Sequence, residues 1–126
     1  MEKTILFFYG SLKRGYSNHH RVRGAFLGEV VTEPRFRIIE LGQYGGLIRD
    51  DANGVAVKGE LWAVDAACLA ELDEFETGEG LWARFPVEVQ GHDNADSYFW
   101  TGDVPADVRS SDFWPFNPLS SPRPAG

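Results

Sequence analysis

The strongest indication of the fold is the run TILFF at residues 4–8, followed at once by YGSLKRG at residues 9–15. β-Branched and aromatic residues that end at a glycine predict a strand leading into a tight loop. The backbone N–H groups of such a loop can point together at an anion. Gly10 and Gly15 have the spacing of a phosphate-binding P-loop, but the lysine that must follow the second glycine is absent. We therefore expect the loop to bind a carboxylate rather than a triphosphate.

Further short strands with glycine-rich turns follow along the chain. The pattern predicts strands at residues 5–9, 25–32, 36–41, 46–49, 55–64, 84–90 and 97–101. Glycines and Asp/Asn clusters predict turns at residues 42–46, 50–54 and 91–94. Many short strands and a single clear helix favour a closed or nearly closed sheet over a doubly wound one.

The predicted helix covers residues 66–76, with Asp65 as its N-cap. Leu69, Leu72 and Glu76 are spaced i, i+3 and i+7, so they share one stripe of the helix. A carboxyl group at the end of an apolar stripe loses water, and the negative end of the helix dipole also disfavours its charge. Both effects predict a raised pKa for Glu76, which suits proton transfer near neutral pH. The alternative is that the helix frays at Phe75 and Glu76 turns into water.

Composition excludes several classes of function. A chain of 126 residues with 43% hydrophobic residues fits one folded domain. The net charge of −7 disfavours nucleic acid, which requires a basic face. With Cys68 as the only cysteine, no intramolecular disulfide is possible, and we expect a cytoplasmic protein without a signal peptide or membrane span. The tail at residues 115–126 is rich in proline and serine, so we expect it to be extended.

Four motifs together resemble the gamma-glutamylcyclotransferase-like family, which includes AIG2-like and gamma-glutamylamine cyclotransferase branches. They are YGSLKRG followed by Asn18 and His19, VKGELWAV at residues 57–64, LDEFE at residues 72–76 and LWAR at residues 81–84. The resemblance implies an α+β fold, a small mixed β-barrel with flanking helices. We assign it to residues 1–114 as a single domain.

The resemblance also implies a reaction in which the α-amine of a γ-glutamyl group attacks its own γ-carbonyl and closes 5-oxoproline. Glu76 occupies the position of the family's catalytic glutamate. The nucleophile belongs to the substrate, so neither metal nor cofactor is expected. Backbone N–H groups of Gly10, Ser11 and Leu12 are the expected clamp on the α-carboxylate, with an ordinary tight turn as the alternative.

Other candidate residues have structural interpretations beside the functional ones. Substrate contacts are expected at Tyr9, Tyr98 and Arg84, although the tyrosines also suit the core and the arginine suits an ion pair with Asp73. Cys68 is expected to be a buried thiol. The remaining candidates are His19, His20 and His92, which we expect in surface loops and not as metal ligands.

Two other functions stay open: a binding module for a small acidic metabolite, and an acyltransferase or hydrolase acting on a γ-glutamyl thioester or a carrier-bound substrate. We expect the wall of the substrate pocket to come from residues 42–51 and the aromatic segment FWPF at residues 113–116. The sequence carries no signal for an oligomeric state.

Overall fold

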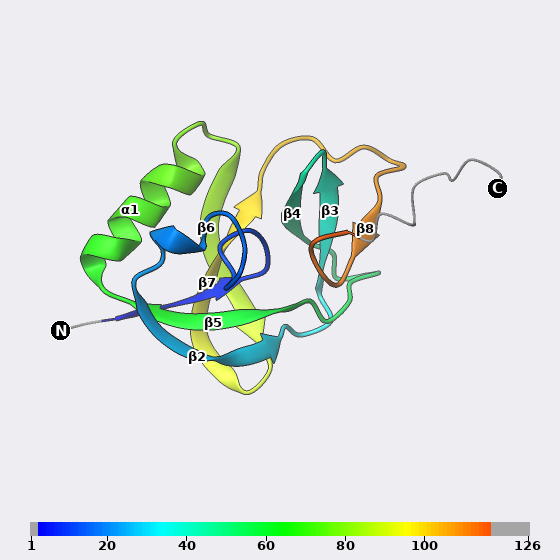
Figure 1. The fold of residues 1–126 in the computed structure, drawn as a ribbon. Coiled ribbons are helices and arrows are strands. Elements are labelled where there is room, and N and C mark those ends of the chain that lie inside the picture. Colours follow the sequence, from blue (N-terminus) through cyan, green and yellow to red (C-terminus); the bar gives the residue numbers. More distant parts are fainter. Residues whose placement is uncertain (1–2, 117–126) are drawn as a thin grey trace, which may run out of the picture.

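A computed structural model describes residues 3–116 of the chain. This part forms one mixed sheet with one α-helix and one short 3-10 helix (Figure 1). The elements are β1 (Thr4–Phe8), η1 (His19–Arg21), β2 (Gly24–Val31), β3 (Phe36–Leu41), β4 (Tyr44–Arg49), β5 (Lys58–Val64), α1 (Ala66–Thr77), β6 (Trp82–Val89), β7 (His92–Trp100) and β8 (Ser110–Ser111). The strand order is β2-β5-β1-β7-β4-β3-β8, and β6 pairs with β7. This arrangement confirms the predicted α+β class with a mixed, barrel-like sheet.

Strand β1 lies at the centre of the sheet, antiparallel to β5 and parallel to β7. Its side chains alternate between two buried clusters because successive residues of a strand point to opposite faces. Phe7 belongs to one cluster, with β3, β4 and β7 residues such as Ile38, Leu47 and Phe99. Leu6 and Phe8 belong to the other, beneath α1. Burial on both faces fixes the end of β1, and with it the loop that follows.

Helix α1 packs against β6 and η1 and begins as predicted. The Asp65 side chain caps it by accepting a 2.9 Å hydrogen bond from the backbone N–H of Cys68. Leu72 and Cys68 are fully buried against the sheet, whereas Glu71 and Glu74 are exposed. The predicted inward stripe and the buried thiol are therefore both confirmed. In Figure 1, α1 and the β3, β4 and β8 strands lie at opposite ends of the molecule.

All the predicted strands form, but some boundaries differ. Residues 92–94 belong to β7 rather than to a turn, because the chain reverses within two residues at Gly91, whose φ is +80°. Strand β5 begins at Lys58, and before it Val55 makes only an isolated bridge to Phe36. Neither β8 nor η1 was expected from the sequence.

The C-terminal aromatic segment meets the domain. Trp114 and Phe116 pack against the cluster that contains Phe7. From residue 117 onward, the tail predicted at residues 115–126 lies outside the described residues. Between residues 3 and 116, no helix has the length and apolar character needed to cross a membrane.

Candidate active site

A cleft of about 240 Å³ opens where the loop after β1 meets the C-terminal part of α1. Its lining comes from five regions of the sequence: the end of β1 with its loop, the start of β4, the end of α1 with the start of β6, β7, and the C-terminal segment. The lining residues include Tyr9, Gly10, Ser11, Leu12, Asn18, Tyr44, Gly45, Phe75, Glu76, Glu79, Trp82, Tyr98 and Trp114. Every site residue expected from the sequence is among them except Arg84.

Glu76 lies in the last turn of α1, one helical turn beyond the buried Leu72, and points into the cleft. Burial raises the pKa of its carboxyl to about 7, and the nearby positive charge of Arg21 only partly offsets this rise. No group in the described part of the chain forms a hydrogen bond with the carboxylate. The Glu76 carboxyl can therefore gain or lose a proton near neutral pH without breaking a structural contact.

The loop after β1 is a tight turn held by several hydrogen bonds. The N–H of Lys13 donates to the carbonyl of Gly10 at 3.0 Å, which closes the turn. Asn18 holds Ser11 twice, because its side-chain amide donates to Oγ at 2.8 Å and its backbone N–H donates to the carbonyl at 3.0 Å. Within residues 3–116, no backbone carbonyl accepts the N–H of Ser11 or Leu12. These two donors remain available at the cleft.

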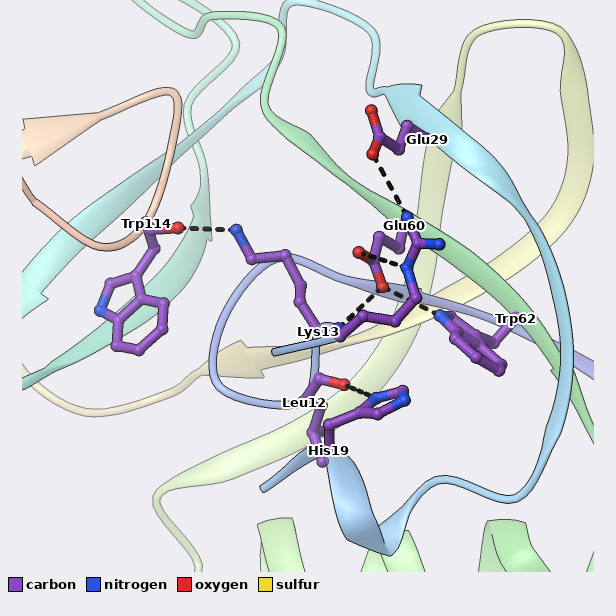
Figure 2. A network of polar contacts seen from close by, with 8 residues as sticks. Leu12, Lys13, His19, Glu29, Glu60, Trp62 and Trp114 are labelled. Carbon is purple, nitrogen blue, oxygen red and sulfur yellow. Dashed lines mark hydrogen bonds and ion pairs between the residues drawn. The ribbon is translucent and has the colours of Figure 1, made fainter. Parts of the chain in front are cut away.

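Glu60 on β5 and His19 on η1 also hold the loop in place (Figure 2). The buried carboxylate of Glu60 on β5 accepts the backbone N–H of Arg14 at 3.1 Å, its Nε at 3.2 Å and the indole N–H of Trp62 at 3.1 Å. Burial opposes the charge on Glu60, but these donors outweigh it and hold the pKa of the carboxyl below its usual value. His19 Nδ1 donates to the carbonyl of Leu12 at 2.9 Å, so His19 supports the loop and is not a free surface residue.

Tyr9 and Tyr98 line the floor of the cleft. The hydroxyl of Tyr9 donates to the carbonyl of Tyr98 at 2.8 Å and accepts the N–H of Leu47 at 3.1 Å. The hydroxyl of Tyr98 donates to Asp73 Oδ1 at 2.7 Å. Burial raises the pKa of both phenols, and nearby carboxylates, Glu76 for Tyr9 and Asp73 for Tyr98, raise it further. Both tyrosines therefore stay protonated and serve as fixed hydrogen-bond donors.

Arg84, which was expected to contact the substrate, lies outside the cleft and pairs with two carboxylates. Its guanidinium forms a bidentate pair with Asp73, at 2.9 and 3.2 Å, and a further bond of 2.6 Å with Asp96. Three of its donors are therefore already occupied, and the side chain does not line the cleft. Asp73 links Arg84 to the hydroxyl of Tyr98. Arg84 thus holds Asp73, the alternative interpretation that the sequence left open.

The wall opposite α1 comes from Tyr44, Gly45 and Trp114, which lie within the two regions expected to supply it. Phe75 and Glu79 were not expected at the site. Phe75 comes directly before Glu76, but the sequence did not single it out as a site residue. Glu79 lies beyond the end of the helix, where helical periodicity does not predict which way a side chain points. Between residues 3 and 116, no group of three or more His, Cys, Asp or Glu side chains is placed to hold a metal ion.

Comparisons with known proteins identify the family and the fold. A model of the family described as gamma-glutamyl cyclotransferase, AIG2-like, matches residues 6–115. The chain is 34% identical to human gamma-glutamylaminecyclotransferase over 95 residues, which cover 69% of this chain and 62% of the human one. It is 37% identical to the Escherichia coli gamma-glutamylcyclotransferase family protein YtfP over 84 residues, 67% of this chain and 72% of that protein. The crystal structure of an AIG2-like protein from Mus musculus has the same fold, with a TM-score of 0.76, 24% identity and 100% coverage of both chains.

Proposed function

Because this chain belongs to the AIG2-like gamma-glutamyl cyclotransferase family, we propose that it releases 5-oxoproline from a γ-glutamyl amine or peptide, with Glu76 as the general acid and base. The observation that carries this proposal is the position of Glu76. Its carboxyl group has a pKa of about 7 and shares one cleft with the N–H groups of the β1 loop.

The proposed reaction is an internal acyl transfer. The neutral α-amine forms a bond to the γ-carbon, and the bond from that carbon to the departing nitrogen breaks. Glu76 takes a proton from the attacking amine and returns it to the departing nitrogen, so one carboxyl serves both steps. The products are 5-oxoproline and a free amine, and no oxidant, metal or cofactor enters the balance.

The β1 loop supports the proposal by offering a site for the α-carboxylate. The free N–H groups of Ser11 and Leu12 can donate to an anion, and Asn18 and Glu60 hold the loop in place before a substrate arrives. A substrate gripped there has its amine folded over its carbonyl, which replaces a bimolecular encounter with an internal one. Preorganised donors cost no rearrangement during the reaction.

The binding module, which is the alternative function, is less well supported. A site that only holds a metabolite has no need for a carboxylate near pKa 7 without hydrogen-bond partners, whereas proton transfer needs one.

The single cysteine, Cys68, is buried and unpaired, which agrees with the proposed cytoplasmic location.

The test is a panel of γ-glutamyl amines and γ-glutamyl dipeptides, with 5-oxoproline measured by chromatography. We expect release from at least one member and a fall in kcat of roughly 10²–10⁴-fold in Glu76→Gln, because that variant cannot exchange the proton. Glu74→Gln is the matched control, since Glu74 lies on the exposed side of the same helix, and it should turn over like the wild type. Unchanged turnover in Glu76→Gln would remove this glutamate from the mechanism. No release from any member would favour the binding module.

A further inference from the structure

We propose that Trp114, fixed by Lys13, is the specificity-determining wall that limits the size of the departing amine. This inference rests on the proposed function, because it concerns the same cleft. Tyr44, Gly45 and Trp114 line the side of the cleft that neither the proton transfer nor the carboxylate clamp uses. We therefore expect the departing amine to contact these three residues.

Lys13 holds the backbone of Trp114 in place (Figure 2). Only 4% of Lys13 is exposed, and its ammonium donates a 2.6 Å hydrogen bond to the carbonyl of Trp114, 101 positions away in the chain. The ammonium also lies 4.0 Å from the ring centre of Phe113 and 5.1 Å from that of Tyr16. A buried ammonium is costly without such partners, so these contacts define one position for the C-terminal segment.

The indole ring of Trp114 is fixed by two further contacts. A Cβ atom at position 45 would lie 2.7 Å from Cδ1 of Trp114, so the ring packs directly on the bare backbone of Gly45 in β4. On another side, the ring meets Tyr16 edge-on, with 5.3 Å between ring centres. With its carbonyl held by Lys13 as well, the ring cannot easily turn aside to admit a larger group.

Lys13 links the β1 loop, which is the proposed carboxylate clamp, to Trp114, which is the proposed wall. Ser11 and Leu12 immediately precede Lys13 in the same loop, so the residues that grip the substrate also fix the distance to Trp114. The cleft of about 240 Å³ is smaller than the roughly 300–1,000 Å³ usual for small-molecule sites. A substrate anchored at the loop thus has limited room for its departing amine, and Trp114 is the largest side chain on that wall.

The experiment compares γ-glutamyl ethylamide with γ-glutamyl benzylamide in the wild type, Trp114→Ala and Lys13→Met. We expect the ratio of kcat/KM for the benzylamide to that for the ethylamide to rise about tenfold in Trp114→Ala, the scale of discrimination that small differences in an apolar pocket produce. Lys13→Met keeps the bulk of the side chain but cannot donate to Trp114, so the ratio should rise in the same direction.

Lys58→Met is the matched control. Lys58 pairs with Asp112 at 3.2 Å in the same C-terminal segment, but it is exposed and does not line the cleft. An exposed pair contributes little to structure. The ratio of kcat/KM for the benzylamide to that for the ethylamide in Lys58→Met should equal that of the wild type.

A second readout separates this inference from the proposed function. Glutaric acid monoamides with ethyl and benzyl groups keep the carboxylate but lack the α-amine, so they bind without reacting. Their affinities, measured by calorimetry, should show the same change of ratio in Trp114→Ala and Lys13→Met. If the wild type releases no 5-oxoproline but the ratio of affinities changes in the variants, the proposed function is wrong and the role of Trp114 in limiting the departing group is supported. If turnover occurs and both ratios stay unchanged in Trp114→Ala, Trp114 does not limit the size of the departing amine.

Discussion

The hydroxyl of Tyr9 donates a 2.8 Å hydrogen bond to the carbonyl oxygen of Tyr98, a residue 89 positions further along the chain. The same hydroxyl accepts the backbone N–H of Leu47 at 3.1 Å. One buried atom therefore ties the start of the β1 loop to β7 and to β4. The loop's position at the cleft depends on this contact as much as on the glycine that follows.

Tyr9→Phe should lower the free energy of unfolding by about 1–3 kcal/mol, because it removes the buried hydrogen bonds to the carbonyl of Tyr98 and from the N–H of Leu47. The loop should also lose its alignment, so kcat/KM for 5-oxoproline release should fall. Urea denaturation and steady-state kinetics measure the two effects. Tyr44→Phe is the control for stability, since Tyr44 is exposed and should change it by less than about 0.5 kcal/mol. Equal stability of Tyr9→Phe and the wild type would contradict the role of the hydroxyl.

Arg84 should act through Asp73 and Tyr98 rather than on the substrate. Arg84→Met leaves Asp73 and Asp96 without their shared cation, so we expect a loss of about 1 kcal/mol of stability, kept small because all three groups are partly exposed. Arg84→Lys should recover part of this loss, but not the bidentate geometry. Arg23→Met removes an exposed pair with Glu71 and should leave the free energy of unfolding nearly unchanged by the same urea assay. A large rise in KM without any loss of stability would instead indicate that Arg84 binds substrate directly.

The raised pKa of Glu76 predicts how stability depends on pH. In the folded protein the pKa is about 7, above the ordinary value of 4.5. Between these two pH values the folded chain keeps a proton that the unfolded chain has lost, so this group makes the protein less stable as pH rises from 4.5 to 7. Glu76→Gln cannot ionise and should be more stable than the wild type at pH 8, on the order of 1–3 kcal/mol, but not at pH 4. Urea denaturation at both pH values measures this, and an identical pH profile for the two proteins would contradict the burial of the charge.

Activity should follow the ionised form of Glu76. The carboxylate must accept a proton from the substrate, so the ionisation of Glu76 should add to the rise of kcat/KM with pH up to about 7 and add nothing above it. The substrate's ammonium must also lose a proton, so kcat/KM should continue to rise above pH 7, with a smaller slope, until the amine is fully neutral. A pH–rate profile whose slope does not change near pH 7 would count against Glu76 as the base.

The sequence predicted the inward stripe of α1 because Leu72 and Glu76 follow a local period that packing did not override. It predicted the β1 loop for the same reason, since a strand, a glycine and a turn are all adjacent in the chain. The contacts that fix Trp114 at the cleft could not be predicted in this way. The contact from Lys13 to Trp114 spans 101 positions, and the fit of the indole on Gly45 depends on the pairing of strands. No periodic pattern reports such contacts.

The role of Arg84 likewise could not be decided from the sequence. Both a substrate contact and an ion pair with Asp73 were compatible with its place in the sequence. Its pairing with Asp96 depends on β6 lying beside β7, where Pro86 is the partner of Asp96 in the register. That tertiary contact takes up the guanidinium, and local residue types could not indicate it.

The carboxyl carbon of Glu76 can be followed by NMR through a pH titration of protein carrying ¹³C in its glutamate side chains, with the signal assigned by its loss in Glu76→Gln. The predicted midpoint lies near 7, and it should move upward when glutarate binds, because a second negative charge in the cleft disfavours ionisation. A midpoint near 4.5 that glutarate does not move would place the carboxylate in water, away from any bound anion, and would contradict its role in the reaction.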